Sequence, residues 1–231
     1  MNESGLELLS NLNFCVFDLE TTGGNLQSDK IIEIGLVRIE KLKIVEEKSY
    51  LIRPEIQIPD FIQKLTSIKQ EDVISAPIIE EVIDDILLFM SDSILVAHNT
   101  AFDVPFLNSV LRRLGRPELT NKALCTNIMT KYMIPNILSS NLNYMSKIFQ
   151  LGDHKAHRAL DDARITAHLL IKFLQVFIDK GLNKVNNIYY PKNKFELDRF
   201  HYKKGQSLDD QSFFDKISHI SSPFTITFKG P

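Results

Sequence analysis

Three short apolar segments near the start of the chain restrict the fold more than any other feature. They are rich in β-branched and aromatic residues, as buried strands are, and they span residues 13–19, 31–39 and 44–52. The connections between them are short, which predicts a meander of neighbouring strands. Pro54 and Pro59 then end this section.

Helical periodicity follows Pro77, where apolar residues recur at helical spacing over 78–90. We expect a further short buried strand at 93–97 and helices at 102–114, 126–133, 142–149 and 159–179. Strands first, then alternating helices and strands, predict an α/β fold whose sheet is covered by helices. We place one domain at residues 1–180 and a C-terminal extension of uncertain structure at 181–231.

Composition is typical of a globular protein with a full core: 44% of the 231 residues are hydrophobic and 24% are charged. No apolar run reaches the roughly 18–20 residues that span a bilayer, and the first residues do not read as a signal peptide. We therefore expect a cytoplasmic protein. Cys15 and Cys125 lie in apolar stretches, which favours reduced core residues over reactive ones.

The net charge of −2 is unusual for a protein that holds long nucleic acid through phosphate contacts. It argues against a passive duplex binder. An enzyme whose acidic site recruits divalent cations remains possible, because those ions supply the positive charge that a phosphate needs.

The first candidate carboxylates, Asp18 and Glu20, come at the end of the first predicted strand. Side chains two residues apart on a strand point to the same face, so the two would converge. In open α/β sheets, ligands bind at the carboxyl ends of strands. An isolated Asp-x-Glu pair is a weak signal, and its meaning depends on partners elsewhere in the chain.

Asp103 is the second candidate. It lies shortly before Pro105, so it fits the N-cap of the following helix. It also shares a helical face with Leu107 and Val110, and a carboxylate on an apolar stripe is costly unless it is paired or binds metal. Cap and metal ligand both stay open on this evidence.

Two neighbouring aspartates are the third candidate. Asp162 aligns with the apolar side of the predicted helix, whereas Asp161 aligns with its charged side and reads as a surface charge. His157 precedes Asp162 by five residues, or about 140° of helix rotation, so we place this histidine in the loop before the helix, where it can lie over the site. His154 and His168 fit surface positions better.

This set suits phosphodiester hydrolysis with two metal ions. Two divalent cations would clamp the scissile phosphate, and carboxylate ligands favour Mg²⁺ or Mn²⁺. A histidine is suited to take the proton from the attacking water. The residues are Asp18, Glu20, Asp103, Asp162 and His157.

With these residues in place, the chain resembles the DEDDh family of 3′→5′ exonucleases, which includes the proofreading epsilon subunit of bacterial DNA polymerase III. The resemblance covers roughly residues 10–180 and rests on three motifs: FDLETTG at 17–23, HNTAFD at 98–103 and HRALDDA at 157–163. The loop histidine argues against the sister group that has tyrosine there.

The resemblance implies a ribonuclease-H-like fold whose first strands are antiparallel and whose later strands are parallel. It implies that Asp18, Glu20, Asp103 and Asp162 hold two metals and that His157 is the general base. The residues implied along the terminal nucleotide and its pocket are Thr21, Thr22, Gly23, His98, Asn99 and Phe102.

The expected activity is removal of nucleotides from the 3′ end of single-stranded DNA in proofreading or repair. An exoribonuclease that trims RNA is the alternative, because the motifs do not encode the sugar. A non-catalytic module that holds a strand end is less consistent with four converging carboxylates. The extension could tether the chain to a polymerase, hold a strand through its basic residues, or be only a tail.

Overall fold

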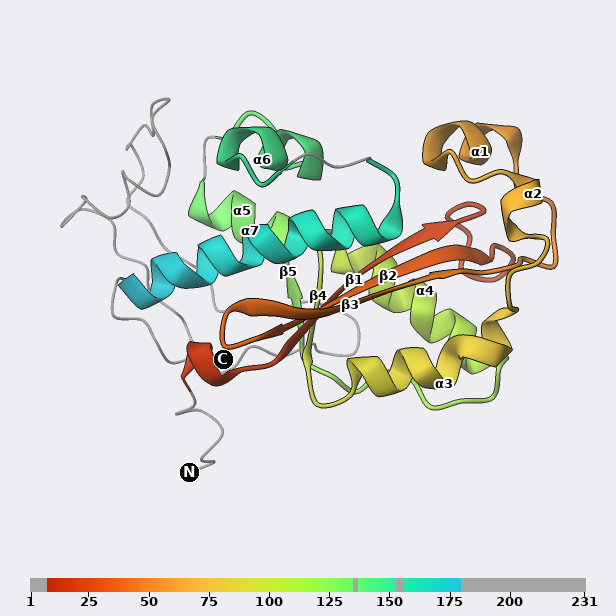
Figure 1. The fold of residues 1–231 in the computed structure, drawn as a ribbon, viewed down its shortest axis with the longest axis horizontal. Helices are drawn as coiled ribbons and strands as arrows, with labels where there is room; N and C mark the ends of the chain where they lie inside the picture. Colours follow the sequence, from red (N-terminus) through yellow and green to blue (C-terminus); the bar gives the residue numbers. More distant parts are fainter. Residues whose placement is uncertain (1–7, 135–136, 153–155, 180–231) are drawn as a thin grey trace.

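The computed structural model describes residues 8–134, 137–152 and 156–179. Within them a five-stranded sheet has the order β3-β2-β1-β4-β5 (Figure 1). The strands are β1 (Phe14–Thr21), β2 (Ile31–Glu40), β3 (Lys43–Leu51), β4 (Ile94–Ala97) and β5 (Ala123–Cys125). The helices are α1 (Asp60–Thr66), α2 (Gln70–Val73), α3 (Ile79–Met90), α4 (Thr100–Arg113), α5 (Thr126–Met133), α6 (Leu142–Phe149) and α7 (Ala159–Asp179).

The sheet is mixed, as predicted. β1 pairs antiparallel with β2, and β2 pairs antiparallel with β3, which confirms the meander. β4 then lies parallel to the other side of β1, and β5 lies parallel to β4. The carboxyl ends of β1 and β4 therefore lie at the same end of the sheet.

One face of the sheet packs against α7. Phe14 and Val16 of β1 join a buried cluster with residues of α5, α6 and α7, among them Phe173. In Figure 1, α7 runs along the strands with α5 and α6 beside it. This packing fixes the long helix against the face on which alternate β1 residues, including Asp18 and Glu20, lie.

The opposite face packs against α3 and α4. Cys15 and Phe17 of β1 are fully buried there, together with Ile83 of α3 and Phe106 of α4. Cys15 and Cys125 are both free and buried, as expected, and burial raises the pKa of the Cys15 thiol to about 12. Such a thiol stays protonated and unreactive at neutral pH.

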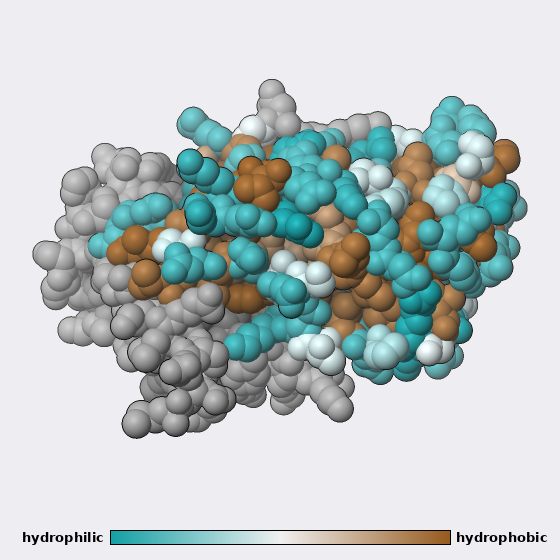
Figure 2. All heavy atoms as spheres, turned by 60° about the horizontal axis from the view of Figure 1, so that its bottom comes forward, coloured by the Kyte–Doolittle hydropathy of each residue, from teal (hydrophilic) through white to brown (hydrophobic). Residues whose placement is uncertain are grey.

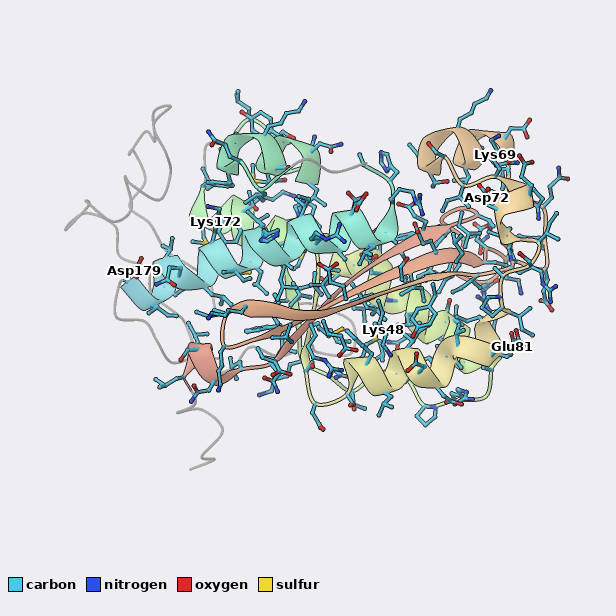
Figure 3. All side chains as sticks on the ribbon, in the orientation of Figure 1. Lys48, Lys69, Asp72, Glu81, Lys172 and Asp179 are labelled. Carbon is cyan, nitrogen blue, oxygen red and sulfur yellow. The ribbon has the colours of Figure 1, made fainter. Side chains whose placement is uncertain are left out.

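Four short elements were not predicted: β5, α1, α2 and a 3-10 helix at Leu9–Asn11. β5 has only three residues, and α1 and α2 pack with Ile32 of β2 in a small cluster of their own. The backbone N–H of Lys69 donates to the Asp72 carboxylate at 2.8 Å, which caps α2; both residues are labelled in Figure 3. Segments this short carry too few apolar positions to show a clear period.

The surface mixes hydrophilic and hydrophobic residues, as the face drawn in Figure 2 shows. On the described part of the chain, no helix combines the length and the hydropathy that crossing a membrane requires. The proposed boundary at residue 180 and the extension beyond it lie outside the described residues.

Candidate active site

Asp18 and Glu20 occupy alternate positions at the carboxyl end of β1. Asp18 lies opposite Gly35 of β2, and Glu20 lies opposite Glu33. Both carboxylates therefore face the side of the sheet that α7 covers, as their spacing predicts. Glu20 is 9% exposed, and Asp18 is half-buried.

Asp103 reaches the same end of the sheet from α4. This helix begins at Thr100, three residues after the end of β4, and Asp103 is only 3% exposed in its first turn. Burial raises the pKa of Asp103 to about 7, and hydrogen bonds from its own N–H and that of Leu19 partly oppose the rise. The effect of Leu19 on this pKa places the Asp103 carboxylate beside β1. Asn99, not Asp103, is the N-cap of α4, so the capping interpretation of Asp103 is wrong.

Asp162 and His157 complete the cluster from the start of α7. Glu20, His157 and Asp162 each offer one side-chain atom that could bind a metal ion, and these three atoms lie within 4.8 Å of one another. His157 lies before the helix, as predicted, in the left-handed region with φ of 62°. Its backbone N–H donates to Asp162 Oδ2 at 3.0 Å, so the aspartate also holds the loop that carries the histidine.

The helix face separates Asp162 from Asp161 as the sequence predicts. Thr166, Leu169 and Phe173, on the side of Asp162, are buried. Asp161 instead accepts a hydrogen bond from Arg164 at 2.8 Å on the outer side. Of the two neighbours, only Asp162 belongs to the cluster.

Burial and mutual repulsion dominate the electrostatics of this cluster. The pKa of Asp18 is raised well above its ordinary value, first by burial and then by the negative charges of Asp103, Asp162, Glu20 and Glu33. Burial also raises the pKa of Glu20 to about 8, with a further contribution from Asp162. The donor set fits hard divalent cations, because carboxylate oxygens are their preferred ligands and a cation removes the repulsion.

Two of the residues expected along the terminal nucleotide hold the loop after β1. The Thr21 hydroxyl donates to the Gly23 carbonyl at 2.7 Å, and the Thr22 hydroxyl donates to Asp29 Oδ1 at 3.1 Å. Thr22 is 1% exposed. These hydrogen bonds hold the backbone of residues 21–23 beside the carboxylate cluster. Contact between these residues and a nucleotide stays a prediction.

The residues expected in the nucleotide pocket differ in exposure. Asn99 is exposed and Phe102 is half-buried, with its ring 5.5 Å from that of Phe106. His98 has both ring nitrogens engaged: Nδ1 with the Thr126 hydroxyl at 2.9 Å and Nε2 with the Ser140 carbonyl at 2.8 Å. Burial lowers the pKa of His98 to about 4, so the ring is neutral at physiological pH and links β4 to α5 and the loop before α6.

Sequence reasoning assigned no role to Glu33, Gly35 and Arg158. Glu33 accepts hydrogen bonds from Arg158 and from the Ala159 N–H. A Cβ at Gly35 would lie 2.2 Å from the Ala159 carbonyl carbon. An acid and a glycine inside an apolar strand are unusual, and this feature of the sequence could have identified Glu33 and Gly35.

Comparison with known proteins gives the family. The RNase T family model, described as Exonuclease, matches residues 15–170. The chain belongs to this exonuclease family. The match covers β1 to β5 and most of α7, and so includes all five residues of the cluster.

Relatives of this exonuclease-family chain include parts of larger proteins. It is 38% identical over 175 residues to DNA polymerase III PolC-type of Caldanaerobacter subterraneus subsp. tengcongensis, which covers 76% of this chain and 12% of that protein. It is 32% identical over 188 residues to DNA polymerase III subunit epsilon of Aquifex aeolicus, with 81% and 91% covered. The chain spans 11% to 25% of the length of the PolC-type and DinG relatives.

Solved structures show the same fold. Exonuclease X in complex with 5′ overhanging duplex DNA has a TM-score of 0.58 and 30% identity, covering 70% of this chain and 91% of that one. The nuclease domain of 3′hExo, a DEDDh family member bound to rAMP, has a TM-score of 0.63 and 22% identity, covering 80% and 100%. The predicted ribonuclease-H-like mixed sheet is thereby confirmed.

Proposed function

We propose that this chain is a metal-dependent 3′→5′ exonuclease that hydrolyses the terminal phosphodiester bond of single-stranded DNA and releases nucleoside 5′-monophosphates. The observation that carries the proposal is the convergence of Glu20, His157 and Asp162 within 4.8 Å at the carboxyl end of β1. Buried Asp103 and half-buried Asp18 at the same end supply the other carboxylates.

In the proposed reaction, the oxygen of a water molecule attacks the terminal phosphorus and the bond to the preceding O3′ breaks. Two divalent cations, Mg²⁺ or Mn²⁺, held by Asp18, Glu20, Asp103 and Asp162, would supply Lewis acidity and charge neutralisation. His157 accepts the proton of the attacking water, which its exposed ring before α7 can do without unfolding the helix. The departing O3′ takes up a proton, so the shortened strand keeps a 3′-hydroxyl.

The terminal nucleotide would lie between the loop after β1 and the start of α4. Thr21, Thr22 and Gly23 support this proposal from one side, because their hydrogen bonds hold the loop beside Glu20. Asn99 and Phe102 would lie on the other side, at the N-cap and in the first turn of α4. His98 would support this pocket indirectly, because its hydrogen bonds to Thr126 and Ser140 hold the end of β4.

DNA is the preferred substrate in this proposal because relatives are named DNA polymerase III and a similar structure holds duplex DNA with a 5′ overhang. The same names support a polymerase as a partner and a cytoplasmic location. Trimming of RNA is the second candidate, favoured by the likeness to a nuclease domain bound to rAMP. The choice depends on how the sugar is recognised.

The test is digestion of 5′-labelled single-stranded DNA and RNA of matched sequence, with Mg²⁺ or Mn²⁺, by the wild type, His157→Ala and His168→Ala. His168 is a matched control, because it lies half-buried further along α7, beside Glu47 and Arg164. We expect a single-nucleotide ladder from the 3′ end that His157→Ala slows by roughly 10²–10⁴-fold and His168→Ala leaves unchanged.

The strand that is degraded faster decides between DNA and RNA. Absence of a ladder on both strands with either metal would contradict the proposal and favour a strand-end binding module. A ladder that is equally fast with His157→Ala would contradict the role of this histidine as general base.

A further inference from the structure

Glu33 is a fifth carboxylate beside the proposed site, and it is buried. It is 1% exposed and lies on β2 directly opposite Glu20. Its negative charge contributes to the raised pKa values of both Asp18 and Glu20. A buried acid next to four others is costly unless opposite charge and hydrogen bonds hold it.

Arg158 and the start of α7 supply those bonds. Arg158 Nη2 donates to Glu33 Oε1 at 2.7 Å, and Arg158 Nε donates to Oε2 at 3.1 Å. The backbone N–H of Ala159, the first residue of α7, donates to the same Oε2 at 2.9 Å. The pair is bidentate, and it also satisfies a helix N-terminal N–H that has no partner within the helix.

This three-bond contact holds the segment that carries His157. Arg158 follows His157 directly, and the left-handed φ of His157 requires the flanking backbone to be held, because a non-glycine residue rarely adopts it. On its other side the His157 backbone is fixed by the bond from its N–H to Asp162 Oδ2. The backbone of His157 is thus held on both sides.

We propose that Glu33 and Arg158 are positioning residues for the reaction: their ion pair holds His157 over the carboxylate cluster. This inference rests on the proposed exonuclease function. Neither side chain is proposed to touch the reacting phosphate. Instead, the ion pair keeps the loop that carries His157 at a fixed distance from β2, the strand that lies beside Glu20.

A second ion pair of the same chemistry provides an internal comparison. Arg164 of α7 donates to Glu47 of β3 at 3.0 Å and 2.7 Å, so it also joins α7 to the sheet through a bidentate pair. It lies on the outer side of the helix, away from His157. If joining α7 to the sheet were all that mattered, loss of either pair would affect the reaction similarly.

The experiment measures kcat and KM for 3′ digestion of 5′-labelled single-stranded DNA by the full chain. Glu33→Gln keeps the size of the side chain and an acceptor for Ala159, but it removes the charge that pairs with Arg158. We expect kcat to fall by roughly 10–100-fold, as for residues that orient a reacting group, with KM changed less than about threefold. Glu47→Gln is the matched control and should keep the wild-type kcat.

The decisive comparison repeats Glu33→Gln in a His157→Ala background, with enzyme in excess. If the ion pair acts through His157, adding Glu33→Gln to His157→Ala lowers the cleavage rate constant by less than about threefold, because the group that the ion pair positions is already gone. Three results would overturn the inference. Glu33→Gln could lower the rate as much in the His157→Ala background as in the wild type, it could change only KM, or Glu47→Gln could lower kcat equally.

Thermal melting of each variant shows whether it folds. Arg158→Lys is the second route if Glu33→Gln unfolds, because lysine keeps the charge but cannot form the bidentate pair. It should reduce kcat in the wild-type background and not in the His157→Ala background, and an additive loss would overturn the inference. An inactive wild type would instead contradict the proposed function itself, so the two failures are distinguishable.

Discussion

Substitution of Gly35 by alanine tests how closely α7 must approach β2. Gly35 lies opposite Asp18 in the sheet, and a Cβ there would stand 2.2 Å from the Ala159 carbonyl carbon and 2.3 Å from both the Ala159 oxygen and the Leu160 nitrogen. Carbon atoms in contact prefer about 3.5–4.0 Å, so the helix start would have to move by more than roughly 1 Å. The atoms concerned are backbone, and no side-chain rotation can relieve the overlap.

The magnitude follows from where this movement occurs. Ala159 lies two residues after His157 and three before Asp162, so the side chains of both proposed site residues move with it. A misplacement of about 1 Å can cost roughly 10²-fold in rate, so we expect Gly35→Ala to lower kcat by about 100-fold. Overpacking should also lower the free energy of unfolding by about 1–3 kcal/mol.

The assay combines digestion of 5′-labelled single-stranded DNA with urea unfolding. Gly24→Ala is the matched control, because a Cβ at Gly24 meets nothing within 4 Å. That variant should keep the wild-type kcat and can gain up to about 1 kcal/mol from the stiffer unfolded chain. Wild-type kcat and stability in Gly35→Ala would refute the reasoning that close packing of α7 on β2 sets the site.

Three further predictions concern the carboxylates and one helix cap. Asp162→Asn should lower kcat by roughly 10²-fold or more, whereas Asp161→Asn, which weakens the exposed pair with Arg164, should change it less than about twofold in the same digestion assay. Burial raises the pKa of Glu20 to about 8 and that of Asp103 to about 7, so the folded chain keeps protons that the unfolded chain has lost. Without metal, stability should fall as pH rises from near 4 through about 8, and Mg²⁺ should raise the melting temperature more at pH 8 than at pH 5; equal shifts would contradict this. Asn141 Oδ1 accepts the Tyr144 N–H at 2.7 Å, and Asn141→Ala should lower the free energy of unfolding by about 1 kcal/mol in urea titration without changing kcat.

Long segments with a strong period were predictable from the sequence. The helix at 159–179 agrees with its expected bounds, and its buried side separates Asp162 from Asp161 because one face of a helix in contact with a sheet must be apolar. The same logic holds for β1, where alternate residues place Asp18 and Glu20 on one face. In both elements the spacing of apolar residues shows which side of the element is buried.

Contacts between distant segments were not predictable in this way. Glu33 and Arg158 are 125 residues apart, and nothing near either residue in the sequence identifies the other as its partner. α1 and α2 are similar, because their stability depends on burying Ile62 and Val73 against Ile32 of β2 and not on a pattern of their own. Such features require the tertiary structure, since their cause lies outside the local sequence.

The site unites carboxylates that repel one another, so its geometry must be imposed by elements that are stable for other reasons. β1 and α4 are buried in the core on the α3 side, and α7 buries its inner side against the opposite face. The start of α7 meets β2, where Glu33 accepts a hydrogen bond from the Ala159 N–H and Gly35 permits close approach. Gly35 therefore permits the close approach of the start of α7 to the β1 acids, and Glu33 holds the neighbouring loop that carries His157, so β2 shapes the site although it contributes no proposed catalytic residue. Changes on β2 should accordingly alter the rate of the chemical step more than their distance from the scissile phosphate would suggest.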